Sequence, residues 1–229
     1  MVPREIVLKF IVIFFEGEII MKKRYIFDLD GTLMRGDFRN FTDQYLLEQL
    51  GEEARPVVGH IHDYLSQYER TFPRYTDENL SRFLREQTGV PFTPELIREW
   101  DELVVELPNT LEEGVLETLE ELKRRNRDIV VLTNWYTESQ RKRLAKEGIL
   151  PYFRAIYGGD LMTKPHKEAY WVAAAGCKPR ECIFVGDNVD FDYVGPKSCG
   201  YDAVLYDKND THHKSIVKIK RMNEILDFK

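Results

Sequence analysis

Tyr25-Ile26-Phe27-Asp28-Leu29-Asp30-Gly31-Thr32-Leu33 is an apolar run that ends abruptly in two carboxylates one residue apart. Such a run predicts a buried strand, and Gly31 permits the sharp turn and close ligand approach that would end it. Ligands of open α/β sheets bind at the carboxyl ends of the strands, so this position predicts a site. Asp28 and Asp30 would repel each other there unless a cation or a shared proton intervened.

Further strands are predicted by four more apolar runs, which alternate with helical patterns along the rest of the chain. These runs cover residues 129–132, 155–157, 182–185 and 203–205, and the clearest helices after the first strand are expected near 111–125, 138–148, 167–175 and 222–226. Strands that alternate with helices predict an α/β fold. We expect a Rossmann-like open parallel sheet with helices on both faces and a site along its carboxyl edge.

A long block between the first and second predicted strands has a different character. Residues 38–106 show no strand-like alternation, and their apolar residues recur three and four positions apart, as on one helix face. Thr76 and Thr93 each precede an acidic first turn and are expected to cap helices. A simple crossover between strands needs far fewer residues, so the block predicts an inserted all-helical domain.

The bulk composition limits the possible functions. The chain has 229 residues, a net charge of -6 and a pI near 5.5, which argues against a general nucleic-acid binder. Its three cysteines fit neither a disulfide framework nor a paired metal site, so reduced thiols in a cytoplasmic protein are expected. An acidic chain that handles phosphates would have to supply positive charge locally at its site.

Residues 1–20 are interpreted as an N-terminal extension of uncertain role, with Met21 as a candidate alternative start. The apolar stretch 6–15 is too short to span a bilayer, and no small-residue cleavage site follows it. An extra edge strand and an interfacial anchor remain alternatives, and no membrane partner is expected.

Four motifs in order resemble those of the haloacid dehalogenase-like superfamily. The first, hhhhDxDGT followed by an apolar residue, is specific and lies in residues 25–33, whereas the others gain weight only from their order. Thr133-Asn134 follows the second predicted strand, Lys164-Pro165 follows the third, and Gly186-Asp187 opens a GDxxxxD motif that ends at Asp192. The usual Gly-Ala after this motif is Gly195-Pro196 here, which is expected to alter the helix after the site.

The resemblance implies a role for each matching residue. It assigns the nucleophile to Asp28 and the general acid/base to Asp30, and it implies a Mg²⁺ cofactor. The implied catalytic residues are Asp28, Asp30, Thr133 and Lys164; the substrate-binding residues are Thr133, Asn134 and Lys164; the metal ligands are Asp28, Asp30 through its carbonyl, Asp187 and the supporting Asp192. Asp190 is an additional acid whose role stays open.

The resemblance also implies a domain organisation and an activity. It predicts a core of residues 21–34 and 108–229 with a helical cap of residues 35–107. The expected protein is a Mg²⁺-dependent phosphatase that hydrolyses a small phosphorylated metabolite through an aspartyl phosphate, as a monomer or homodimer. A phosphosugar mutase and a non-catalytic binding or regulatory relative are the alternatives.

Two related reactions are less favoured by the residues present. Dehalogenase chemistry has no need of a second acid such as Asp30, and a phosphonate hydrolase would need a cap lysine, which residues 38–106 lack. Trp135 and Tyr136 are expected to line the substrate entrance. Five cap residues are candidates for binding an anionic substrate tail, although a surface position is the commoner role for each: Arg35, Arg39, His60, His62 and Arg74.

Overall fold

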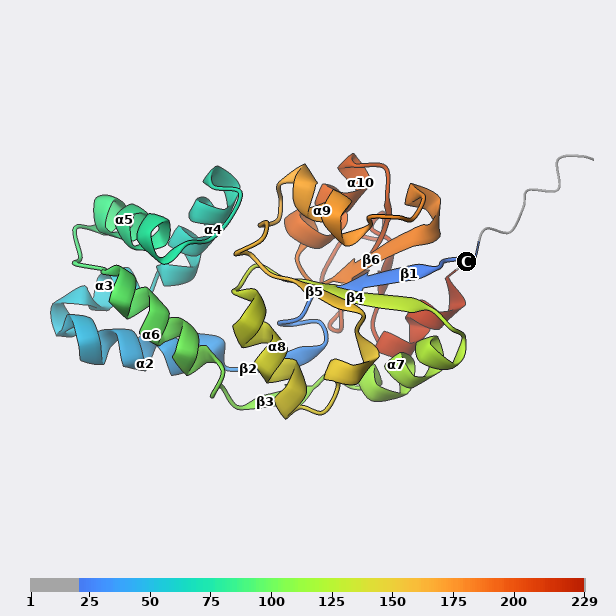
Figure 1. Cartoon of the computed structure of the whole chain (residues 1–229), viewed down its shortest axis with the longest axis horizontal. Helices are drawn as coiled ribbons and strands as arrows, with labels where there is room; N and C mark the ends of the chain where they lie inside the picture. The colour runs from blue at the N-terminus through green and yellow to red at the C-terminus, as the bar shows by residue number, and fades with distance from the viewer. Residues whose placement is uncertain (1–20, 229) are drawn as a thin grey trace, which may run out of the picture.

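A parallel sheet with helices on both faces forms the larger part of the protein (Figure 1). The computed structural model describes residues 21–228. The strand order is β5-β4-β1-β6-β7-β8, and every neighbouring pair is parallel. The strands are β1 (Arg24–Phe27), β4 (Asp128–Leu132), β5 (Ala155–Tyr157), β6 (Cys182–Gly186), β7 (Asp202–Tyr206) and β8 (Lys218–Ile219). The predicted fold class is confirmed; residues 1–20, interpreted above as an extension, lie outside the described residues.

The central strand β1 is buried on both faces because its side chains alternate between two separate cores. Tyr25 and Phe27 pack with α7 (Val115–Arg124) and α8 (Thr137–Lys146). Ile26 points the other way, toward α9 (Lys167–Ala173). This two-sided burial explains why the sequence of the strand is a continuous apolar run.

A second group of helices lies beside the sheet and has a core of its own (Figure 1). We call residues 38–104 the helical unit. It contains α2 (Phe38–Leu50), α3 (Arg55–Val58), α4 (Ile61–Thr71), α5 (Asp77–Thr88) and α6 (Pro94–Val104). Thr76 and Thr93 cap α5 and α6 as predicted, because their hydroxyls accept hydrogen bonds from the amides of Asn79 and Leu96 at 3.1 and 3.2 Å.

A small antiparallel ribbon joins the helical unit to the sheet. It consists of β2 (Met34–Gly36) and β3 (Asn109–Leu111). The sequence predicted a helix from Leu111, and this was wrong: Leu111 pairs with Met34, and α7 begins only at Val115, after Gly114 at φ +80°. Pairing between segments this far apart leaves no local pattern in the sequence.

The chain after the fourth motif departs from regular α-helix. Val189–Val194 forms a π-helical turn, and α10 (Gly195–Ser198) follows with Pro196 in its first turn. The expectation that the Gly195-Pro196 pair alters the segment after the site stays a prediction. At the end of the chain, Met222–Asp227 is a 3₁₀ helix. None of the helices within residues 21–228 combines the length and the apolarity needed to cross a membrane.

Candidate active site

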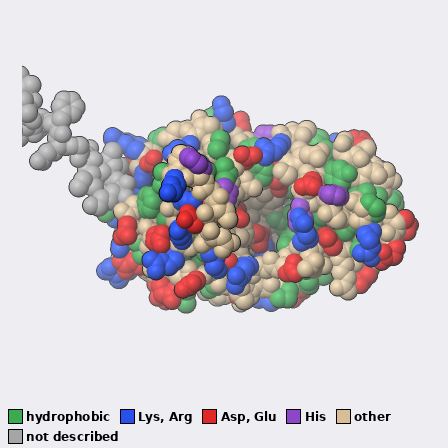
Figure 2. All heavy atoms as spheres, turned by 180° about the vertical axis from the view of Figure 1, so that it is seen from behind, with side chains coloured by type: hydrophobic (Ala, Val, Ile, Leu, Met, Phe, Trp, Pro, Cys, Tyr) green, Lys and Arg blue, Asp and Glu red, His purple; other side chains and the backbone are tan. Residues whose placement is uncertain are grey.

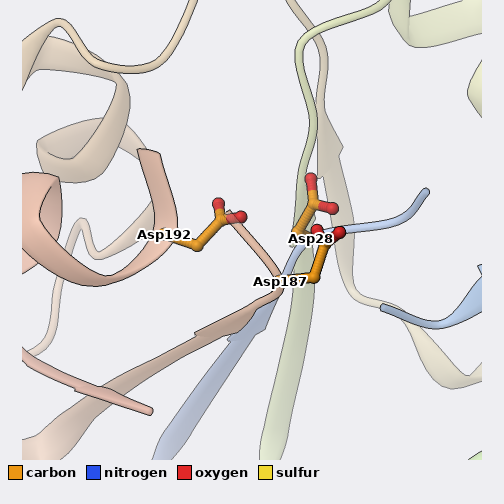
Figure 3. Close-up of side chains that lie close together, drawn as sticks. All are labelled: Asp28, Asp187 and Asp192. Carbon is orange, nitrogen blue, oxygen red and sulfur yellow. The ribbon is translucent and has the colours of Figure 1, made fainter. Parts of the chain in front are cut away.

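Three carboxylates meet at the carboxyl edge of the sheet (Figure 3). Asp28 follows β1, Asp187 follows β6, and Asp192 comes from the π-helical turn after it. Their nearest oxygens all lie within 4.8 Å of one another. The convergence follows from the sheet, since β1 and β6 are adjacent and parallel, with Phe27 opposite Val185.

Lys164 is the cation of this cluster. Its Nζ lies 2.7 Å from Asp28 Oδ1 and 2.7 Å from Asp192 Oδ1, and the residue is 3% exposed. Asn134 holds it in place: the Lys164 amide donates to Asn134 Oδ1 at 2.7 Å, and Asn134 Nδ2 donates to the Lys164 carbonyl at 2.9 Å. The second and third motifs are thereby joined directly to each other.

The electrostatics of the cluster favour an additional cation. Burial raises the pKa of Asp28 well above its ordinary value, and Asp192 and Asp187 add to this while Lys164 opposes it. Asp187 faces the cavity, but the surrounding protein still removes much of the water around its carboxyl. This burial, together with the negative charge of Asp192, raises the pKa of Asp187 to about 6. Burial alone would lower the pKa of Lys164, but Asp192 and Asp28 outweigh it, so the net direction is upward. One lysine therefore leaves the three carboxylates short of positive charge.

The donor atoms of the cluster fit a hard divalent cation. All three residues offer carboxylate oxygens, the ligands that Mg²⁺ prefers, and a bound cation would remove the repulsion between them. The acidic cluster can therefore hold a metal ion.

Asp30 has a separate environment from Asp28. Arg143 holds its carboxylate in a two-pronged ion pair, with Nη2 to Oδ1 at 2.6 Å and Nη1 to Oδ2 at 2.9 Å. Gln140 Nε2 donates to Asp30 Oδ2 at 3.2 Å and to Thr133 Oγ1 at 3.1 Å. The second acid of the first motif is thus oriented by α8.

Sequence reasoning missed both of these α8 residues. Arg143 is completely buried and also donates to Asn109 Oδ1 of β3 at 2.7 Å, so it connects Asp30 to the ribbon. The helix carries several charged residues, and most of them are exposed. The available signal was the three-residue spacing of Gln140 and Arg143, which places both on one helix face just after the second motif.

Gly31 is required by the geometry of the site for two reasons. Its φ of +82° lies in the left-handed region, which residues with a Cβ rarely adopt. A Cβ at this position would also collide with the Asp187 carboxylate. The glycine of the first motif therefore lets the backbone turn directly beneath the acidic cluster.

A cavity of about 370 Å³ opens above these residues, with walls from both the sheet and the helical unit. The face seen in Figure 2 is hollowed between these two parts. The floor of the cavity contains the predicted residues of the four motifs: Asp28, Asp30, Thr133, Asn134, Lys164, Asp187 and Asp192. Its walls add Phe38, His62, Leu65, Ser66 and Glu69 from the helical unit, and Trp135, Asn188 and Phe191 from the sheet side.

Most of the other residues considered from the sequence lie outside the cavity lining. Asp190 is exposed and pairs with Arg70 at 2.7 Å, and Tyr136 donates to Asp77 Oδ1 at 2.8 Å outside the cavity lining. Of the five cap residues considered for an anionic tail, His62 lines the cavity, whereas the rest are on the surface: Arg35, Arg39, His60 and Arg74. Of the two residues expected at the substrate entrance, Trp135 alone lines the cavity.

Comparison with known proteins places this arrangement in a family. A model of the haloacid dehalogenase-like hydrolases matches residues 22–200. The pyrimidine 5'-nucleotidase PynA of Streptococcus pneumoniae is 24% identical over 90% of this chain and 94% of its own length. A phosphoglycolate phosphatase of Pectobacterium atrosepticum is 31% identical over 88% of this chain and 86% of its own.

Solved structures support the same fold at lower identity. The L-2-haloacid dehalogenase of Xanthobacter autotrophicus superposes with a TM-score of 0.66 at 17% identity, over 90% of this chain and 97% of the dehalogenase. The family model spans most of the chain, and the four motifs identified in the sequence lie within the matched residues and converge on one cavity. The chain therefore belongs to the haloacid dehalogenase-like hydrolases.

Proposed function

We propose that the protein is a Mg²⁺-dependent phosphatase that hydrolyses monoesters of small phosphorylated metabolites. The observation that carries this proposal is the pairing of Asp28 with Lys164 on the cavity floor, beside Asp187 and Asp192. The relatives described above support it, since they are named as a nucleotidase and a phosphatase.

The acidic cluster is the proposed metal site. The side chains of Asp28, Asp187 and Asp192 would hold Mg²⁺ together with the Asp30 carbonyl. When bound, the ion supplies positive charge that offsets the charge of the phosphoryl group.

In the proposed first step, Asp28 attacks phosphorus in line and Asp30 donates a proton to the leaving alkoxide. Asp30 then takes a proton from water, which hydrolyses the aspartyl phosphate. Lys164 offsets charge on the transferring group, and Thr133 with Asn134 binds its oxygens. Arg143 donates hydrogen bonds to both carboxylate oxygens of Asp30. At least one of these bonds must break before Asp30 can carry a proton and donate it to a leaving group.

The helical unit is proposed as the cap that excludes water and selects the leaving group. We retain the predicted boundaries for this proposal: residues 35–107 for the cap, with 21–34 and 108–229 for the core. The helical unit supplies five of the cavity-lining residues, which supports this division of roles.

The test is phosphate release from phosphorylated sugars, nucleotides, small acids and an aryl phosphate, with Mg²⁺ and with a chelator. Asp28→Asn should lower kcat by at least ~1,000-fold with the fold intact, as expected for loss of a nucleophile. Asp190→Asn is the matched control, because Asp190 is exposed and outside the cavity lining, and its activity should be unchanged.

The reaction intermediate gives a second measurement. Acid-quenched enzyme should carry one added phosphoryl group by mass spectrometry, and the Asp28→Asn variant should not. Release of phosphate by the Asp28→Asn variant at the wild-type rate would refute the nucleophile assignment. Isomerised phosphosugar without free phosphate would indicate the mutase reaction instead.

A further inference from the structure

One cavity-lining carboxyl has no part in the two-step chemistry. Glu69 of α4 is 8% exposed, and its Oε1 accepts a hydrogen bond from Tyr75 Oη at 2.7 Å. Asn134 and Lys164 lie beside the carboxyl. A carboxylate has about four acceptor sites, so the bond from Tyr75 leaves acceptor capacity for a ligand.

The position of Glu69 relative to Lys164 is fixed by hydrogen bonds from both sides of the lysine. His166 Nε2 donates to the Glu69 carbonyl at 2.9 Å. Thr163 donates twice to the segment that follows α4: its Oγ1 to the Phe72 carbonyl at 2.8 Å, and its amide to the Pro73 carbonyl at 2.8 Å. These bonds fix the backbone of Glu69 and of the segment after it, and the hydrogen bond from Tyr75 restrains the carboxyl itself.

The upper cavity contains little positive charge. Among the described lining residues, Lys164 is the only Lys or Arg, and it is already shared between two aspartates on the floor. His62 lines the wall, and burial lowers its pKa, which favours the neutral ring. Arg70 is not among the lining residues; it pairs with Asp190, and its guanidinium lies over the ring of Phe191 at 5.0 Å from the ring centre. A second anionic group on a substrate would meet Glu69 with no cation to balance it.

Flat apolar surfaces and a free polar atom complete the walls. Phe38, Trp135 and Phe191 come from three separate segments, and the first two rings meet edge to face at 5.9 Å. His62 Nε2 is buried and has no hydrogen-bond partner within residues 21–228. Aromatic walls with a few polar groups suit a ring that also carries hydrogen-bonding atoms. A volume of about 370 Å³ is at the small end of the range for ligand sites.

We propose that the substrate is the monophosphate of an uncharged leaving group that has hydroxyls and a flat ring, as in a nucleoside 5'-monophosphate. Glu69 accepts a hydrogen bond from a sugar hydroxyl and disfavours any second anion, and the aromatic wall packs against the base. Glu69 is thus the residue that determines specificity. This inference rests on the proposed phosphatase function.

The test compares kcat/KM for uridine and adenosine 5'-monophosphates, ribose 5-phosphate, phosphoglycolate and pyrophosphate, with Mg²⁺ present. It is run at pH 8, because burial raises the pKa of Glu69 to about 7 and the carboxyl must be ionised. We expect the nucleotides to exceed the two doubly anionic substrates by at least ~10-fold. Glu69→Gln keeps an acceptor for Tyr75 but removes the charge, so it should reduce the ratio of nucleotide to phosphoglycolate by at least ~10-fold. Glu86→Gln, on the exposed surface of α5, should leave the ratio unchanged.

The outcomes separate this inference from the function on which it rests. Phosphate release that favours phosphoglycolate or pyrophosphate, or a ratio that Glu69→Gln leaves unchanged in a folded protein, overturns the inference while the phosphatase stands. A preference for ribose 5-phosphate over both nucleotides overturns the role of the aromatic wall. No release from any substrate overturns both proposals.

Discussion

Glu69 should make the protein less stable as the pH rises, because the fold buries its carboxyl. Burial raises the pKa of Glu69 from 4.5 to about 7, although Tyr75 and Asn134 oppose this effect. Such a change corresponds to about 3 kcal/mol of penalty on the ionised form. Below about pH 4.5 the carboxyl is neutral in the folded and unfolded chains, and no penalty applies. Between pH 4.5 and about 7 the unfolded chain loses its proton first, so the free energy of unfolding falls as the pH rises.

Replacing Glu69 with Gln removes this titration. The free energy of unfolding of the variant, relative to that of the wild type, should increase by about 2–3 kcal/mol from pH 5 to pH 8. Urea denaturation of both proteins at the two pH values measures the difference. Glu86→Gln is the matched control on α5 and should change the unfolding free energy by less than about 0.5 kcal/mol at either pH. Equal effects of Glu69→Gln at pH 5 and pH 8 would refute the burial argument.

Three further substitutions test other parts of the structure. Arg143→Lys keeps the charge but loses the two-pronged grip on Asp30, so kcat should fall by about 10–100-fold with KM within about threefold; an unchanged kcat would contradict the orienting role. Gly31→Ala should cost more than about 1 kcal/mol in urea denaturation and lower activity, because of its positive φ and the collision with Asp187. Thr93→Ala should cost about 1 kcal/mol of unfolding free energy through its lost cap, with kcat unchanged; a wild-type unfolding curve would count against the cap.

The sheet and the floor of the cavity were predictable from local signals. β1, β4 and β6 are continuous apolar runs, because each is buried on both faces. The motif residues follow such strands directly, and parallel strands bring their carboxyl ends to one edge. The positions of Asp28 and Asp187 therefore follow from strand register alone.

The parts that were missed depend on contacts between distant segments. β3 pairs with β2 across the whole helical unit, so no local pattern marks Leu111 as a strand residue. Arg143 is a basic residue on a helix whose other basic residues face solvent, and only the tertiary structure distinguishes it. Glu69 was unrecognised for the same reason, since its helix pattern identifies an apolar face and gives no sign that a carboxyl points into a cavity.

The hydrogen bonds on either side of Lys164 have a consequence for timing. Thr163 and His166 hold the end of α4 and the segment after it, and Lys164 lies between them in the chain. If the helical unit lifts to exchange substrate for product, these bonds must break, because their acceptors move with α4. Entry of solvent would then coincide with loosening of the backbone on both sides of the lysine. Asn134, Asp28 and Asp192 would still hold Lys164 itself, so opening would release the residues on either side of the lysine while the lysine kept its own contacts.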